Sequence, residues 1–369
     1  MISDVISSAA EISVENTSVF YNACRDNDIK LVKELLPNMT IAQINHVEPN
    51  GNTALHIATQ NEHKEIIELL LNVGISRSIQ NQNEQTAYSI APNTDIKHLF
   101  ERFTQELPSD ETNSEFDGEN RFVSKIRWID ANPHADFEAT KQRNLLIKYG
   151  TNPKFHFLVN FARQYYIDEE LKDIQGIDQI RYFFDKAEEE QNPVYLLKAY
   201  TAETGFYTAL NRHLAAAQLE GTGPIDSNRG RAYILGIITH HPYFARFNFT
   251  GESYRGMKLD EYDLQQYVIG SRIMTKTFLS TSKDREMAEV FAFGIYANEN
   301  RTGKYGVVCT YHLRNPGTGL DIESISEYPG EKEVLIIPYA AFKVMNVKKE
   351  KRGDDGIAVK IELKECEPW

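Results

Sequence analysis

The spacing of apolar residues changes once along the chain. Before about residue 250 apolar positions recur at helical spacing, and afterwards they form short runs rich in branched residues. The sequence predicts helices over residues 155–166, 177–189 and 194–219, and strands over residues 307–312, 334–337, 342–347 and 357–363. Residues 351–356, Lys-Arg-Gly-Asp-Asp-Gly, predict a hairpin turn before the last strand. Helices followed by strands indicate an α+β domain.

An internal repeat precedes this region. The pattern Thr-Ala-Leu-His-Ile-Ala at 53–58 recurs as Thr-Ala-Tyr-Ser-Ile-Ala at 86–91, and a looser copy lies upstream. The pattern resembles ankyrin repeats, in which a turn is followed by two short antiparallel helices. In the last copy Tyr88 replaces the usual leucine and Pro92 cuts the first helix short, as expected of a terminal repeat. Such repeats usually bind proteins.

These patterns predict three segments. About three ankyrin repeats span residues 15–103. Residues 104–120 carry six acidic and no basic residues, which is typical of a solvated linker. Residues 121–369 form the α+β domain.

Composition narrows the class of partner. The net charge of −13 argues against nucleic acid or an anionic membrane as the main partner, and no apolar run is long enough to cross a membrane. The three cysteines, Cys24, Cys309 and Cys366, are odd in number and far apart, so we expect reduced thiols. The start of the chain, from Met1 to Glu15, has no basic segment typical of a signal peptide. We therefore expect a cytoplasmic protein.

Three short motifs carry the candidate chemistry. Tyr-Arg-Gly at 254–256 offers Arg255, whose guanidinium can bind phosphate oxygens bidentately. Phe-Leu-Ser-Thr-Ser at 278–282 offers Ser280, while Ser282 is expected to cap the following helix. Glu-Lys-Glu at 331–333 precedes a strand, and in an extended segment both carboxylates would face one side. Each motif alone is more often an ordinary surface feature.

In this order and spacing, the motifs resemble the mono-ADP-ribosyltransferase family of the Arg–Ser–Glu class, over about residues 190–350. The resemblance implies a helical lobe with two packed β-sheets and NAD as the donor substrate. It implies that Glu333 stabilises an oxocarbenium-like ribosyl group, that Ser280 holds Glu333 and that Arg255 binds the pyrophosphate. In this family, a glutamate at the position of Glu331 is associated with arginine as the acceptor.

The same resemblance implies further site residues. Gly256 would contact the nicotinamide carboxamide through its main chain, and Tyr200 and Thr201 would lie near the adenosine site. Phe291 would stack on the nicotinamide ring, with Phe293 as the alternative. Tyr328 would contact the target protein. We expect no metal, because the pair His240 and His241 has no further ligands at metal spacing.

Two other functions stay open, of which the first would use the same residues to break the bond. An NAD glycohydrolase would pass the ribosyl group to water, and a non-catalytic ankyrin scaffold would do no chemistry. The partners expected for the transferase are NAD, a protein substrate carrying an arginine and a protein partner of the repeats. NADP stays open as an alternative donor.

Overall fold

The computed structural model describes residues 17–102, 129–216, 225–293, 305–352 and 356–367. They divide into two compact units. The first contains the repeats up to Arg102 together with two later segments, Asp173–Gly205 and Ser324–Gly330. The second contains the remaining residues. The predicted linker at 104–120 and the turn residues 353–355 lie outside the described residues.

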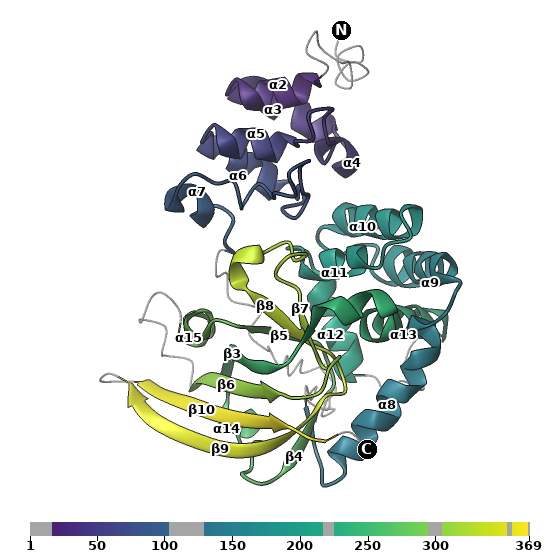
Figure 1. Cartoon of the computed structure of the whole chain (residues 1–369), viewed down its shortest axis with the longest axis vertical. Helices are drawn as coiled ribbons and strands as arrows, with labels where there is room; N and C mark the ends of the chain where they lie inside the picture. Colours follow the sequence, from purple (N-terminus) through teal and green to yellow (C-terminus); the bar gives the residue numbers. More distant parts are fainter. Residues whose placement is uncertain (1–16, 103–128, 217–224, 294–304, 353–355, 368–369) are drawn as a thin grey trace, which may run out of the picture. The chain divides into compact units, whose positions relative to one another are not determined.

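The repeats of the first unit are short helices around one core (Figure 1). Their fully buried residues include Leu55, Ile66, Ile67 and Leu70, which are apolar positions of the repeated pattern. In the last repeat residues 87–90 form turns in place of a first helix, as Pro92 predicts. The elements are α2 (Val19–Arg25), α3 (Ile29–Leu35), η1 (Leu36–Asn38), α4 (Ile41–Ile44), α5 (Ala54–Gln60), α6 (Lys64–Asn72) and α7 (Thr94–His98).

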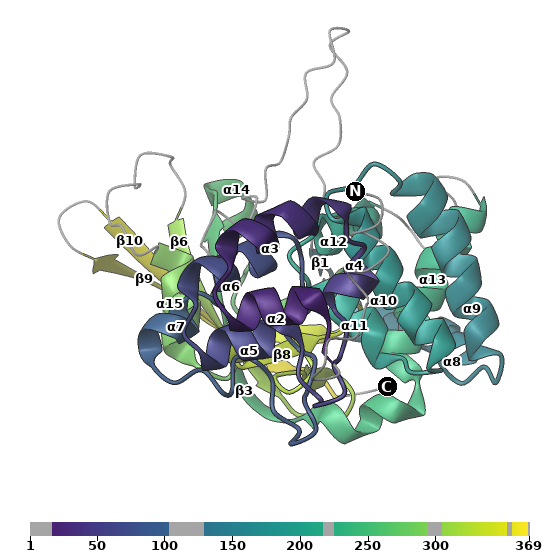
Figure 2. The ribbon, with the colours of Figure 1, turned by 90° about the horizontal axis from the view of Figure 1, so that it is seen from above.

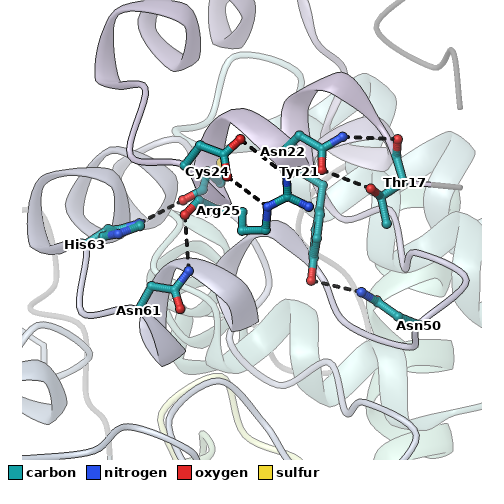
Figure 3. A network of polar contacts seen from close by, with 9 residues as sticks. Thr17, Tyr21, Asn22, Cys24, Arg25, Asn50, Asn61 and His63 are labelled. Carbon is teal, nitrogen blue, oxygen red and sulfur yellow. Dashed lines mark hydrogen bonds and ion pairs between the residues drawn. The ribbon is translucent and has the colours of Figure 1, made fainter. Parts of the chain in front are cut away.

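Hydrogen bonds join successive repeats at their turns (Figure 3). The Nδ2 of Asn61 donates to the carbonyl oxygen of Arg25 at 3.1 Å, and the Nδ1 of His63 lies 2.9 Å from the carbonyl oxygen of Cys24. These bonds satisfy carbonyl groups at the end of α2 that have no partner within the helix. The polar turn residues of the repeat therefore fix how one repeat stacks on the next.

Two helices from the middle of the chain complete the first unit. They are α10 (Ile177–Glu189) and α11 (Val194–Thr201), which lie side by side in both views (Figure 1; Figure 2). The helix predicted over 177–189 is confirmed with the same bounds. The prediction of a single helix over 194–219 is wrong, since residues 202–205 interrupt it and a new helix begins at Phe206.

In the residues that the structure describes, the second unit is built on ten strands. Their order is β1-β4-β9-β10-β6-β3-β5-β8-β7-β2, and all neighbours are antiparallel except β10 and β6. The strands are β1 (Ile129–Ala131), β2 (Asn248–Phe249), β3 (Gly251–Leu259), β4 (Arg272–Thr275), β5 (Leu279–Ser282), β6 (Tyr305–Leu313), β7 (Gly319–Asp321), β8 (Glu333–Ile336), β9 (Ala341–Arg352) and β10 (Gly356–Glu365).

The sheet consists of two parts that meet at one residue pair. Strand β3 pairs with β6 along its whole length but with β5 only at Tyr254 and Ser282. One hydrophobic core contains residues of both parts, among them Val334 and Ile336 of β8 and Val359 and Ile361 of β10. The two parts therefore pack on each other and diverge beyond Tyr254, where the candidate motifs lie.

Helices of the second unit lie beside the sheet. α8 and α13 lie side by side, and α9 and η2 also contact α13 (Figure 1; Figure 2). The helix predicted over 155–166 is observed as α9 followed by a π-helical segment. The elements are α8 (Ala135–Gly150), α9 (Phe155–Ala162), η2 (Arg163–Glu170), α12 (Phe206–Ala216), α13 (Ile225–His240), η3 (Pro242–Phe247), α14 (Glu261–Leu264), α15 (Arg285–Phe293) and η5 (Pro329–Glu331), the last of which continues from the first unit.

Candidate functional site

Arg255 and Ser280 meet where the two parts of the sheet diverge. The Nη1 of Arg255 donates to the carbonyl oxygen of Ser280 at 2.8 Å. The Ser280 side chain is exposed, and Arg255 is half-buried. A guanidinium has five N–H donors in a planar fork, so a bond to one carbonyl oxygen leaves it able to bind an anion as well.

The strand register places Ser282 directly opposite Glu333. Ser282 pairs with Glu333 between β5 and β8, whereas Ser280 pairs with Leu335. Residues opposite each other, and residues two apart on one strand, project to the same face. Ser280, Ser282 and Glu333 therefore lie on the same face of β5 and β8. Of the two serines, Ser282 is the one paired with Glu333. Glu333 is buried, with 2% of its surface exposed.

Glu331 does not continue the strand of Glu333. It ends the short helix η5, and Lys332 has φ +49°, in the left-handed region. The prediction that 331–333 form an extended segment is therefore wrong, because a helix end and a left-handed residue interrupt the alternation of side chains that an extended chain would have. Glu331 is half-buried and Lys332 exposed.

The end of β5 holds this turn. The Ser282 hydroxyl donates to the carbonyl oxygen of Glu331 at 2.7 Å, and the main-chain N–H of Lys283 donates to that of Lys332 at 3.0 Å. The ammonium of Lys332 lies 3.0 Å from an oxygen of Asp284, and this hydrogen bond is the main cause that lowers the pKa of Asp284. Ser282 therefore stabilises the turn before Glu333, a role that no motif in the sequence indicates.

The helix cap lies two residues later than expected. Ser282 belongs to β5, and α15 begins at Arg285. A carboxylate oxygen of Asp284 accepts the N–H of Glu286 at 3.0 Å, so Asp284 caps the helix and the prediction for Ser282 is wrong. The physical reason is that Ser282 is still paired in the sheet.

Gly256 allows α15 to pack directly on β3. A Cβ at this position would lie 1.7 Å from the carbonyl oxygen of Ala288, so only glycine fits without displacing the helix. Phe291 and Phe293, both on α15, are half-buried. Phe293 packs with Ala288, Ala292 and Val308. The close approach of β3 and α15 thus accounts for the glycine, while its expected contact with nicotinamide stays a prediction.

Tyr200 and Thr201 belong to the first unit, at the end of α11. Both are buried, at 4% and 1% exposed. The Thr201 hydroxyl accepts the N–H of Glu327 at 3.1 Å, and its carbonyl oxygen accepts from the Nη2 of Arg102 at 3.0 Å. Thr201 therefore has a structural role within the first unit, and its expected role in adenosine binding stays a prediction.

Tyr328 is buried in the first unit, with 1% of its surface exposed. A residue that contacts a target protein must be accessible, and the structure gives this side chain a different environment between two arginines. The expectation that Tyr328 contacts the target protein is therefore wrong, because its side chain is buried.

The remaining observations concern cysteines, metals and membrane spans. Cys24, Cys309 and Cys366 are free thiols, and burial raises the pKa of Cys24 and of Cys309 to about 12. Within the described ranges, no cluster of three or more His, Cys, Asp or Glu side chains could hold a metal ion. In the same part of the chain, no helix has the length and apolar character needed to cross a membrane.

Comparison with known families assigns both regions. Residues 9–99 match the model of ankyrin repeats in three copies, and residues 246–367 match a domain described as NAD:arginine ADP-ribosyltransferase. The chain therefore joins ankyrin repeats to a domain of the ADP-ribosyltransferase family, and its fold is of that class. Members of this family use NAD as a substrate.

Similar proteins are of two kinds. The chain is 35% identical over 85 residues to the human NAD-capped RNA hydrolase NUDT12, and 32% over 77 residues to the rat oxysterol-binding protein-related protein 1. These matches cover 23% and 21% of this chain, and 18% and 8% of the relatives. The chain thus spans less than a fifth of the length of the curated relatives that it matches.

Two similar solved structures come from bacteria. The ADP-ribosyltransferase Vis of Vibrio splendidus is 17% identical, with 60% of this chain and 90% of that chain covered and a TM-score of 0.36. The effector XopAI of Xanthomonas axonopodis is 15% identical, with 64% and 95% covered and a TM-score of 0.39. These scores are low, so the assignment to the family depends on the family model and not on them.

Proposed function

We propose that this protein is an NAD-dependent ADP-ribosyltransferase that modifies arginine side chains of proteins. The observation that carries the proposal is the meeting of three motifs at one junction. Arg255 of β3 bonds to the main chain of Ser280 in β5, and Ser282 of β5 lies opposite Glu333 of β8 and bonds to the main chain of Glu331. These contacts bring the main chains that carry the guanidinium, the hydroxyls and the two glutamates to one junction, in a domain whose family uses NAD, and this supports the proposal.

The first step breaks the bond between nicotinamide and the ribose C1′. Its electron pair leaves with the nicotinamide, which becomes neutral, and positive charge develops on the ribosyl group. Arg255 would bind the pyrophosphate, and the buried carboxylate of Glu333 would stabilise the developing charge. Ser280 would support Glu333 from the neighbouring strand. Gly256 and Phe291 would contact the nicotinamide, and Tyr200 and Thr201 the adenosine.

The second step forms a bond between C1′ and a guanidinium nitrogen of the acceptor. An arginine side chain is protonated at neutral pH and must lose a proton as it attacks. Glu331 would accept that proton after orienting the guanidinium by paired hydrogen bonds. Transfer to water in place of arginine would make the protein an NAD glycohydrolase.

The test is an incubation of the purified protein with NAD, an arginine analogue such as agmatine, and a mixed protein extract. We expect nicotinamide release together with ADP-ribosyl-agmatine and arginine-modified peptides, both identified by mass spectrometry. Release of nicotinamide with free ADP-ribose alone would support the glycohydrolase. Absence of any nicotinamide release would support a non-catalytic scaffold.

The repeats and the thiols bear on partners and location. Ankyrin repeats bind proteins, so we propose that they recruit a protein partner or the protein substrate. The three free thiols support a cytoplasmic location, where thiols stay reduced. No metal is needed for the proposed steps.

A further inference from the structure

The segment Ser324–Gly330 connects β7 to β8 and ends directly before Glu331. In its fold, however, it belongs to the first unit, together with the repeats. Three groups of contacts within that unit hold it. We call them the loop clasp, defined by two residues of the segment and their six partners: Glu327, Tyr328, Ser76, Arg77, Ser78, Arg102, Thr201 and Glu203.

The first group of contacts surrounds a buried carboxylate. Glu327 has no exposed surface, and its oxygens accept from the hydroxyls of Ser76, at 2.7 Å, and of Ser78. The second oxygen accepts from the main-chain N–H of Arg77 at 2.6 Å. All three donors come from consecutive residues that follow α6 of the repeats. A buried carboxylate is costly unless donors surround it, and charge-assisted bonds of this kind are short and strong.

The second group encloses the ring of Tyr328. The guanidinium carbons of Arg77 and Arg102 each lie 4.4 Å from the ring centroid. The Tyr328 hydroxyl donates to Glu203, which also lies 3.6 Å from the Nη2 of Arg77. Burial raises the pKa of Tyr328, so the phenol stays neutral and keeps its donor. Cation–π contacts on a desolvated ring add to its packing.

The third contact ties the main chain of the segment to α11. The N–H of Glu327 donates to the hydroxyl of Thr201 at 3.1 Å. The carbonyl oxygen of Thr201 in turn accepts from Arg102, the last residue of the repeats described. Main chain, carboxylate and ring of the segment are therefore all fixed by groups of the first unit.

This anchoring constrains Glu331 through the chain itself. Glu331 is the fourth residue after Glu327, and even a fully extended chain of this length spans only about 14 Å. Among the contacts described above, Glu331 is bonded to the second unit only through its carbonyl oxygen, which accepts from the Ser282 hydroxyl, whereas Glu333 is paired with Ser282 as part of β8. The repeats can therefore affect the position of the first glutamate of the motif more than that of the second.

We propose that the ankyrin repeats position Glu331 for the acceptor by holding the segment before it, with Glu327 and Tyr328 as positioning residues. The inference rests on the proposed function, since Glu331 is there assigned to the acceptor. It gives the repeats a part in the reaction, in addition to the binding of partners. Loosening the clasp should impair transfer to arginine more than cleavage of NAD.

The variant that tests this lies in the repeats, far from the motif in sequence. Ser76→Ala/Ser78→Ala removes two donors to Glu327 and changes no residue of the proposed catalytic site. We expect the ratio of ADP-ribosyl-agmatine formed to nicotinamide released to fall about tenfold or more, since small displacements of a catalytic group have effects of that size. Nicotinamide release without acceptor should fall less than about threefold, because Glu333 keeps its pairing.

Two further variants serve as controls. Ser89→Ala makes the same substitution at an exposed serine of the repeats, whose hydroxyl donates to the carbonyl oxygen of Thr86, and should leave the ratio unchanged. Ser76→Thr/Ser78→Thr retains both hydroxyls and should restore a large part of the ratio. Near-ultraviolet circular dichroism and thermal melting check that each variant is folded.

A second measurement does not depend on enzyme activity. Hydrogen–deuterium exchange should show faster exchange in a peptide covering residues 324–331 of Ser76→Ala/Ser78→Ala than of the unchanged protein. If the double variant does not fold, the same two readouts are taken on Tyr328→Leu, which removes the ring's cation–π contacts and hydroxyl but keeps an apolar side chain. Unchanged exchange in the folded variant overturns the clasp.

The remaining outcomes separate the two proposals. Faster exchange with an unchanged ratio, or with equal loss of both reactions, would overturn positioning of Glu331 by the repeats. If the unchanged protein neither releases nicotinamide nor modifies agmatine, the proposed function fails, while the exchange measurement still tests the clasp.

Discussion

Glu333 is the residue on which bond cleavage depends most in the proposed reaction. Glu333→Gln retains the size of a buried side chain but removes the negative charge that faces the ribosyl cation. We expect nicotinamide release and transfer to fall together by about a hundredfold or more, the usual effect of losing one such electrostatic contact. Steady-state kinetics of both products measure this, and near-normal nicotinamide release would contradict the assignment.

A change at Glu331 should instead impair transfer to the acceptor much more than cleavage of NAD. Glu331→Gln removes the group that would accept the proton of the acceptor, so transfer to agmatine should fall by about a hundredfold. NAD cleavage should fall much less, since Glu333 and Arg255 are unchanged. Product analysis by chromatography separates ADP-ribosyl-agmatine from free ADP-ribose, and normal transfer by this variant would show that Glu331 is not the base.

At the scale of elements, the packing of α15 on β3 depends on Gly256. Gly256→Ala would place a methyl group 1.7 Å from the carbonyl oxygen of Ala288, so the helix must move. We expect a loss of about 2–3 kcal/mol, the upper range for overpacking, seen as a lower midpoint in urea denaturation. An unchanged midpoint would mean that the close contact does not exist.

A buried serine on the same strand provides the control. The Ser253 side chain is fully buried, and its hydroxyl has no hydrogen-bond partner among the described residues. Ser253→Ala removes a polar group that lost its hydrogen bonds to water on folding. It should therefore leave stability unchanged or raise it by about 1 kcal/mol.

The first turn of α5 predicts a dependence on pH. The Nδ1 of His56 accepts from the N–H of Thr53 at 3.2 Å, and its Nε2 lies 3.0 Å from the carbonyl oxygen of Gln85. Burial lowers the pKa of His56, so the folded state favours the neutral ring. Its contribution to stability is therefore present above the unfolded pKa of about 6.5 and is lost as the pH falls below it.

His56→Gln tests this contribution. Glutamine at this position can accept the same N–H but does not titrate. Between pH 6.5 and 5, its stability should fall less steeply than that of the unchanged protein, by up to about 1.4 kcal/mol per pH unit. Burial also lowers the pKa of His213, His240 and His241, so part of the acid sensitivity should remain. Equal slopes would show that His56 is not responsible.

Elements with strong periodicity were predictable from the sequence. The alternation from Ile357 to Leu363 gave β10, and the helical period gave α10 with its observed bounds. The break between α11 and α12 at residues 202–205 was not predictable, because no proline interrupts the apolar pattern there. The turn at Lys332 was missed as well, since its left-handed conformation carries no glycine to indicate it.

The site was predictable to the extent that it depends on local motifs. The motifs gave Arg255 and Ser280, which the structure brings together, but not the pairing of Ser282 with Glu333, which depends on strand register. The partners of Glu327 and Tyr328 lie in distant parts of the sequence, so no local pattern indicates them. The sequence therefore suggests a contact of Tyr328 with the target protein, although its side chain is buried.

At the scale of the whole molecule, one compact unit is assembled from three separate stretches of chain. A protein that lacks residues 1–102 would lose the donors to Glu327 and the cations beside Tyr328. We expect lower solubility and faster hydrogen exchange in residues 173–205 and 324–330. Addition of residues 1–102 as a separate chain should restore protection in part. A shortened protein with normal exchange in both stretches would contradict this expectation.

The origin of the three donors to Glu327 also limits how the gene can change. A repeat array without serines at 76 and 78 would offer similar helices but would leave the buried carboxylate of Glu327 with only one of its three donors, the main-chain N–H at position 77. Recombination that exchanges whole repeats should therefore be tolerated only where the replacement brings those hydroxyls with it. We therefore expect the ankyrin repeats and the ADP-ribosyltransferase domain of this chain to evolve together.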